Sequence, residues 1–217
     1  MREESICVAD DSSSSMELAD LLLSRLIILP QSDHLRELRT ILRDKNTEHP
    51  DFVFCADRLF RLVVEEGLNQ LPYHAETIVT PPGHEYDGIR FAKGNCGVSV
   101  CRSGEAMELA LRQCCRIGKI LIGEDRGVLY SRLMTDIAKR RVLLLYPITT
   151  TGYTASKAVE LLLENDVDED NIFLLSVFST PQSIKFLRND FKRLTIITSE
   201  ICTDVPIFFA TRYFGTD

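Results

Sequence analysis

The sequence predicts an α/β protein with a mostly parallel sheet flanked by helices. From about residue 97 onward, short apolar runs alternate with segments of helical periodicity. The apolar runs are continuous, which is typical of parallel strands buried on both faces. The 217 residues suffice for one sizeable domain, and the content of 45% hydrophobic and 26% charged residues is ordinary for a globular protein.

The first part of the chain is predicted to be mainly helical. Residues 1–25 form a flexible lead, with four serines at 12–15, and the start of a first helix that runs from Met16 through Leu26 and ends at Pro30. A second helix begins at Ser32 or Asp33. A third follows Pro50 and ends before Pro72. Their predicted buried residues are Leu35, Leu38, Ile41 and Leu42 in the second helix, and Phe52, Cys55, Leu59, Leu62, Val63 and Leu68 in the third.

A short strand at 77–80 and a turn at 81–83 lead to a hairpin over residues 84–91, centred on the favoured pair Asp87-Gly88. The rest alternates strand and helix, with residues 129–136 left unassigned. The predicted strands are 97–101, 119–122, 142–145, 172–178 and 194–198, and the predicted helices are 104–115, 155–164 and 182–191. Because ligands of such sheets bind at the carboxyl ends of strands, we expect the site in the loops after these strands.

The loop after residue 145 has the composition of a phosphate site. An apolar strand runs into Thr149, Thr150 and Thr151, then Gly152, and a helix begins at once. A helix N-terminus offers unpaired N–H groups, and glycine allows close approach of the backbone. The alternative is that Thr154 merely caps the helix, and the spacing does not decide between them. A Walker-type loop is excluded because no Gly-Lys-Ser/Thr follows.

Composition and scattered residues exclude several other classes. The formal net charge of −7 argues against nucleic-acid binding, and no apolar run is long enough for a membrane span. Seven cysteines without a C-x-x-C pair indicate reduced thiols, and no secretory signal is visible, so a cytoplasmic or nuclear location is expected. The four histidines lack metal-site spacing. We interpret Cys101 as a structural thiol and the pair Glu105 and Glu108 as solvated.

Four stretches resemble the uracil phosphoribosyltransferase family, most closely its animal homologues. They are residues 38–45, 56–68, 97–108 with 116–122, and 212–217, the last reading Arg-Tyr-Phe-Gly-Thr-Asp. The resemblance covers about residues 26–217 and implies a type I phosphoribosyltransferase fold with N-terminal helices and a small hairpin or hood. It also implies transfer of a ribose 5-phosphate from phosphoribosyl pyrophosphate to uracil, giving UMP and pyrophosphate, as in pyrimidine salvage.

The resemblance also implies site residues. Phosphoribosyl pyrophosphate would contact Arg102 and the loop residues Thr150, Thr151, Gly152, Tyr153 and Thr154. A degenerate uracil site would use Phe209, Ala210 and Thr211. GTP is an effector in some members of the family, and here it would contact Arg43, Lys45 and Arg58. Mg²⁺ would accompany phosphoribosyl pyrophosphate in an active enzyme, no metal-binding residues are assigned, and a homo-oligomer is expected.

Two departures from the family pattern concern catalysis. Tyr146 stands where active members place an aspartate that contacts the ribose hydroxyls. The loop that holds uracil is shortened to residues 205–211 and has lost its glycines and acids. Three hypotheses follow: a homologue that binds phosphate or a nucleotide with weak or no transfer, a fully active transferase, and a GTP-responsive, non-catalytic interaction module.

Overall fold

The computed structural model describes residues 25–123, 125 and 127–216. Its centre is a sheet with the strand order β1-β10-β9-β7-β4-β5-β6, and the short β8 pairs with β9. Every pair along this order is parallel except β5 with β6, so the predicted sheet is confirmed. The strands are β1 (Leu26–Ile28), β4 (Asn95–Cys101), β5 (Ile117–Ile122), β6 (Val128–Arg132), β7 (Arg141–Leu145), β8 (Ile148–Thr149), β9 (Ile172–Ser179) and β10 (Thr195–Ile201).

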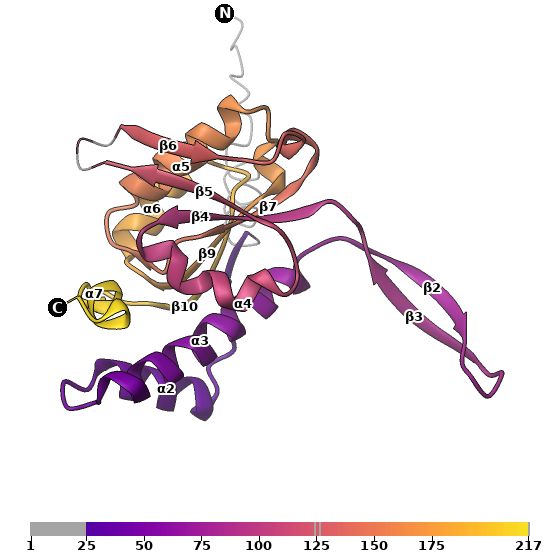
Figure 1. Ribbon diagram of the computed structural model, residues 1–217, viewed down its shortest axis with the longest axis horizontal. Helices are drawn as coiled ribbons and strands as arrows, with labels where there is room; N and C mark the ends of the chain where they lie inside the picture. Colours follow the sequence, from indigo (N-terminus) through magenta and orange to yellow (C-terminus); the bar gives the residue numbers. More distant parts are fainter. Residues whose placement is uncertain (1–24, 124, 126, 217) are drawn as a thin grey trace, which may run out of the picture.

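Helices cover both faces of this sheet (Figure 1). One face carries α2 (Asp33–Arg43), α3 (His49–Asn69), the 3-10 turn η1 (Ser103–Met107), α4 (Glu108–Arg112) and α7 (Phe209–Phe214); the other carries α5 (Tyr153–Glu164) and α6 (Pro181–Asp190). Two further 3-10 turns are η2 (Ile137–Lys139) and η3 (Glu169–Asn171). Along β7, Leu143 and Leu145 belong to the first core, and Val142 and Leu144 to the second. Burial on both faces explains why β7 reads as a continuous apolar run.

Several N-terminal predictions are confirmed and one is wrong. Ser32 caps α2, since its Oγ accepts a hydrogen bond from the N–H of Leu35 at 3.2 Å. The predicted first helix is wrong at its end, because Leu26 lies in β1 and pairs with β10. A short apolar run fits either structure, and pairing with the sheet edge decided it. Residues 1–24, including the serine run, lie outside the described residues.

The helix predicted over 104–115 is replaced by the shorter pair η1 and α4. On α3, Leu62 is 37% exposed and not buried as predicted. The remaining apolar residues named for α2 and α3 are buried or half-buried. No helix in the described part of the chain combines the length and apolar character that a membrane span needs.

The hairpin differs from its predicted form. It pairs β2 (Tyr73–Val79) with β3 (Glu85–Phe91), and it projects from the body as a separate arm (Figure 1). The turn lies at residues 80–84, where Thr80 and His84 exchange hydrogen bonds and Gly83 has φ 93°. Asp87 is inside β3, opposite Thr77. The Pro-Pro-Gly turn therefore sets the register, and Asp87-Gly88 does not.

Candidate functional site

The candidate site lies where the strand order reverses. The chain leaves β4 toward β5 on one side, while β7, on the other side of β4, is followed by β9 and β10. The helix after β4 packs on one face of the sheet and the helix after β7 on the other. Such a reversal leaves a crevice at the carboxyl ends of the two strands. Arg102 follows β4 and Tyr146 follows β7, so both predicted positions border this crevice.

The loop from β7 to α5 has the geometry of a phosphate cradle. Gly152 is the N-cap of α5 and adopts φ 87°, a left-handed conformation that favours glycine. A Cβ at this position would lie 2.9 Å from Cδ1 of Phe186 and 3.3 Å from the carbonyl oxygen of Ser183. The absence of a side chain therefore lets α6 approach the loop. With twelve residues, α5 presents the free N–H groups of its first turn to the loop.

Buried hydroxyl groups of β9 and α6 hold this loop in place through hydrogen bonds. Thr149 Oγ1 lies 2.6 Å from Ser176 Oγ and 3.1 Å from Ser179 Oγ, both on β9. Ser183 Oγ, on α6, donates to the carbonyl oxygen of Thr149 at 3.0 Å. Thr180 Oγ1 donates to the carbonyl oxygen of Thr150. All these hydroxyl and carbonyl groups are neutral, so the hydrogen bonds that hold the loop bring no charged side chain to it.

A cavity of about 510 Å³ opens beside the loop. Thr150 and Thr151 line it, together with Arg43 from α2. Of the other loop residues, Tyr153 packs its ring on Phe186, with the ring centroids 4.7 Å apart. The cavity is also lined by Thr180, Gln182 and residues 203–208. The sequence assigned Thr150 and Thr151 to a phosphate-binding loop, and in the structure the cationic side chain of Arg43 lines the same cavity.

Arg43 is held toward this cavity. Its Nη2 donates to Glu200 at 2.7 Å, and its guanidinium lies 4.6 Å above the ring centroid of Phe178. Glu200 also pairs with the buried Arg39 at 3.5 Å. Sequence reasoning had not identified Glu200, which is the acid at the carboxyl end of β10 that orients Arg43. The sequence did hold a signal for this residue: an acid near the end of an apolar strand, in a chain with arginines on a helix, indicates a possible ion pair.

The three residues suggested for GTP do not form one group. Arg43 faces the cavity beside the phosphate loop, and Lys45 is exposed just after α2. Arg58 is on α3, where its Nη2 lies 3.0 Å from Nε2 of His34 at the beginning of α2. The eleven residues of α2 therefore separate Arg43 from Arg58.

Tyr146 is half-buried and contributes to the core. It packs against the apolar cluster formed by the sheet with α5 and α6. Its N–H donates to the carbonyl oxygen of Leu175 at 3.1 Å, and the carbonyl of Pro147 accepts from Val177 at 2.7 Å. The backbone is thus fixed to β9 at this point. The strand end presents a phenol where a carboxylate would offer charge or a metal ligand.

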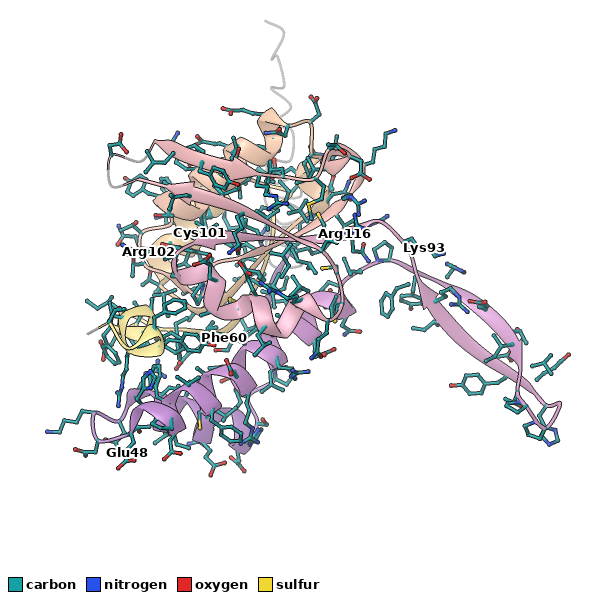
Figure 2. The ribbon with its side chains drawn as sticks, viewed as in Figure 1. Glu48, Phe60, Lys93, Cys101, Arg102 and Arg116 are labelled. Atoms are coloured by element: carbon teal, nitrogen blue, oxygen red, sulfur yellow. The ribbon has the colours of Figure 1, made fainter. Side chains whose placement is uncertain are left out.

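Arg102 lines a second cavity, of about 620 Å³, with Ser103 and Glu105. Ala210 and Thr211 line the same cavity, so the structure brings these two residues of the suggested uracil site to Arg102. Figure 2 shows Arg102 next to Cys101 at the end of β4, on the side of the sheet edge nearer α7.

Phe209, which the resemblance assigned to the uracil site, is not among the described residues that line this second cavity. Its ring is fully buried and meets Phe52, Phe60 and Phe178, with centroids 5.1, 5.6 and 6.1 Å away. An aromatic ring that is fully buried among other rings stabilises the core and does not face solvent, where a ligand would bind. Phe209 therefore positions Ala210 and Thr211 by fixing the first turn of α7.

A charged cluster lies under the Arg102 loop. Glu108 is 4% exposed and accepts a hydrogen bond from the buried Ser99 Oγ at 2.6 Å. Lys119 pairs with Glu105 and, at 3.2 Å, with Glu108, and Arg112 pairs with Glu108. Burial raises the pKa of Glu108, but the hydrogen bonds from Ser99, Arg112 and Lys119 outweigh burial, so its pKa lies below the ordinary value. The prediction that Glu105 and Glu108 are merely solvated is wrong for Glu108.

Cys101 has the surroundings of a structural thiol. Its Sγ lies 3.7 Å from Glu105, and burial together with this carboxylate raises the pKa of the thiol. A thiol with a raised pKa is a poor nucleophile. Within the described residues, no group of three or more His, Cys, Asp and Glu side chains could hold a metal ion. Tyr146 leaves the end of β7 without a carboxylate that could act as a cation ligand.

Comparison with known proteins agrees with the predicted resemblance. The family model described as uracil phosphoribosyltransferase matches residues 29–205. A uracil phosphoribosyltransferase homolog of Danio rerio is 51% identical over 212 residues, covering 94% of this chain and 82% of the relative. A uracil phosphoribosyltransferase of Dictyostelium discoideum is 42% identical over 209 residues, covering 88% of this chain and 97% of the relative.

The fold is also found in a solved structure. The AQ2163 protein from Aquifex aeolicus superimposes with a TM-score of 0.72 at 18% sequence identity, covering 87% of this chain and 97% of that one. The family match spans most of the sheet, both helical layers and the phosphate loop. The chain therefore belongs to the uracil phosphoribosyltransferase family.

Proposed function

We propose that this protein binds the 5′-phosphate of a phosphoribosyl compound at Thr150–Thr154 and transfers the phosphoribosyl group to uracil weakly or not at all. The observation that carries the proposal is Tyr146. It stands at the strand end where related enzymes place an aspartate, and it packs on an apolar cluster. The cradle beside it keeps its glycine, its hydroxyl groups and the helix N-terminus.

The binding half of the proposal depends on charge. A phosphate at the loop would meet the first N–H groups of α5 and the hydroxyls of Thr150 and Thr151. Arg43, which is ion-paired with Glu200, supplies a guanidinium to the same cavity. Arg102 lines the neighbouring cavity, which suits the pyrophosphate of phosphoribosyl pyrophosphate. Mg²⁺ would enter with the pyrophosphate, because this chain offers no carboxylate at the end of β7 to hold it.

The catalytic half depends on what the ribose would meet. Loss of pyrophosphate leaves an oxocarbenium-like ribose, and an enzyme lowers that barrier with negative charge or hydrogen-bond acceptors near the ring. A phenol at Tyr146 supplies a hydrogen bond without a negative charge. The base site is also reduced, since Phe209 is buried in the core and, of the loop 205–211, Ala210 and Thr211 line the cavity beside Arg102.

A direct assay tests this proposal. Labelled uracil and phosphoribosyl pyrophosphate are incubated with the protein and UMP is measured, while calorimetry measures binding of phosphoribosyl pyrophosphate. We expect measurable binding and turnover below about 0.01 s⁻¹, well under the usual range of about 1–10³ s⁻¹. Turnover within the usual range would instead support a fully active uracil phosphoribosyltransferase, the activity named for the Dictyostelium relative.

Tyr146→Asp tests the residue that carries the proposal. A carboxylate at this position would restore charge near the ribose, so we expect UMP formation to rise at least about tenfold, which corresponds to about 1.4 kcal/mol of barrier. Tyr146→Asn is the matched control, because it has similar shape to aspartate without the charge, and it should give no increase. An active wild type that Tyr146→Asp leaves unchanged would contradict the proposal.

GTP response and self-association are parts of the proposal with separate tests. Arg43 lies at the end of α2 and Arg58 beside its beginning, so within one chain they do not converge, and we expect UMP formation and sedimentation to be the same with and without GTP. A GTP-dependent change in sedimentation would favour the interaction module. Exposed apolar side chains on the hairpin arm, among them Ile78, Tyr86 and Ile89, support a homo-oligomer. A cytoplasmic, and also nuclear, location remains a prediction from cysteine usage.

A further inference from the structure

Three arginines line one cavity at the end of the sheet opposite the phosphate loop. Arg116 directly precedes β5, Arg132 ends β6, and Arg140 directly precedes β7. β4 and β5 run parallel, so the beginning of β5 lies at the end of β4 that is remote from Arg102. Figure 2 shows this separation, with Arg116 near Lys93 and the base of the hairpin arm, and Arg102 at the other end of β4.

The antiparallel strand β6 brings two of these arginines together. Because β6 runs back along β5, its last residue, Arg132, returns to the beginning of β5 and pairs with Lys119. Gly118 permits the close approach, since a Cβ there would lie 2.7 Å from the carbonyl oxygen of Arg132. The sequence left residues 129–136 unassigned, so the placement of Arg132 and Arg116 at one cavity is a product of the tertiary structure.

All three arginines line one cavity of about 430 Å³. Its other lining residues are Ile117, Gly118, Leu133, Met134, Thr135 and Asp136. Asp136 is the one acid among these described residues, and Arg140 already binds both of its oxygens at 2.7 Å. Within the described part of the chain, the exposed side chains of Arg116 and Arg132 have no hydrogen bond or ion pair. Two positive charges in the cavity are therefore uncompensated, in a chain whose net charge is −7.

We propose that this cavity is an anion-binding site for a phosphate-bearing small molecule. Guanidinium groups bind phosphate oxygens through two parallel hydrogen bonds, which suits Arg116 and Arg132. The apolar side chains of Leu133 and Met134 provide a wall for the rest of the molecule. The volume of the cavity corresponds to a small molecule more than to a macromolecular surface. The site does not depend on the proposed function, because it shares no residue with the phosphate loop or the Arg102 cavity.

The experiment uses methionine methyl groups of the full-length protein as reporters. The chain has four methionines, of which Met134 lines the cavity and Met107 is fully buried in the core beside α3. Protein labelled with ¹³C at the methionine methyl groups is titrated by NMR with inorganic pyrophosphate, inorganic phosphate and UMP, each at constant ionic strength. We expect a saturable shift of the Met134 signal and little change at Met107. Comparison of the three titrations shows whether free phosphates or a nucleotide phosphate is preferred.

Two double variants decide the outcome. Arg116→Gln with Arg132→Gln should weaken pyrophosphate binding, read at Met134, by at least about tenfold. Arg61→Gln with Lys192→Gln removes the same charge from exposed positions elsewhere and should leave the titration unchanged. Gly152→Ala, at the phosphate loop, should also leave it unchanged, which separates this site from the proposed function. The proposal is overturned if chloride at equal ionic strength gives the same shift, if both double variants behave alike, or if only a hexaglutamate peptide shifts Met134.

Discussion

The two halves of the candidate site are fixed by different interactions. The phosphate loop rests on neutral hydroxyl groups, with Thr149 bonded to Ser176 and Ser179. The Arg102 loop rests on charged groups, with Glu108 bonded to Ser99, Lys119 and Arg112. Neutral hydrogen bonds do not titrate between pH 3 and 7, whereas a carboxylate does near its pKa, which for Glu108 lies below the ordinary 4.5. The two cavities should therefore respond differently to pH, although both lie at the carboxyl ends of the strands.

The largest effect is expected from Phe209→Ala, which tests how α7 completes the charged half. Phe209 fills a fully buried position among three other aromatic rings, so its removal should cost about 3–5 kcal/mol of unfolding free energy, measured by urea denaturation. Phe208→Ala is the matched control, because Phe208 is 43% exposed, and it should cost under about 1 kcal/mol. Equal costs for the two variants would show that α7 is not fixed by Phe209.

Gly152→Ala should have the next largest effect and should act on the neutral half. The left-handed φ of 87° and the contact with Phe186 both oppose a Cβ, so we expect a loss of about 1–3 kcal/mol in stability. Binding of phosphoribosyl pyrophosphate should weaken by at least about tenfold in calorimetry, which corresponds to about 1.4 kcal/mol. Gly83→Ala is the control for backbone strain alone, because Gly83 has φ 93° with nothing within 4 Å of the added Cβ. If Gly83→Ala costs as much, the contact at Gly152 has no effect.

Glu108→Gln tests the pH response of the charged half. The folded pKa of Glu108 lies below the ordinary 4.5, so its ionised form stabilises the protein above that value and the contribution is lost as pH falls through the folded pKa. We expect the variant to be about 1–3 kcal/mol less stable than wild type at pH 7, and the difference to shrink below about pH 4.5. Thermal unfolding from pH 3 to 7 measures it, and a difference independent of pH would contradict the assignment.

Thr149→Val is the corresponding test of the neutral half and has the smallest expected effect. Loss of the hydroxyl removes hydrogen bonds to Ser176 and Ser179, but Ser176 keeps a bond to the carbonyl of Pro147 at 3.1 Å. We expect a cost of about 1 kcal/mol that does not change between pH 3 and 7. Thr151→Val, at an exposed position of the same loop, should cost close to nothing. A marked pH dependence of the Thr149→Val cost would remove the contrast between the two halves.

Local pattern was sufficient for much of the fold. Continuous apolar runs predicted β4, β5, β7, β9 and β10, because strands buried on both faces have no polar face to alternate. The strand-loop-helix from β7 to α5 was also predicted, since an apolar run, a loop of Thr and Gly and a helical pattern define it without reference to distant residues. The strand β1 was missed because Leu26–Ile28 satisfies a helical and an extended pattern equally.

The site beyond the loop could not be predicted in the same way. Phe208 and Phe209 are adjacent residues of the same type, yet Phe208 is exposed and Phe209 is fully buried. Arg43 was grouped with Arg58 by a family resemblance, but its contact with Glu200 directs it to the phosphate loop. Each of these outcomes depends on residues more than a hundred positions away in the chain.

The sequence by itself determined that this is an α/β protein of the uracil phosphoribosyltransferase family, with a loop of Thr and Gly between β7 and α5 and a tyrosine at position 146. These properties are local, because they rest on residue type and near spacing. Only the tertiary structure decided that Glu108 is buried, that Arg43 lines the cavity beside the phosphate loop and that Arg116 and Arg132 line one cavity. Those arrangements arise where separate strands and helices are packed together, and the charge and burial of a side chain are set by the neighbours it meets there.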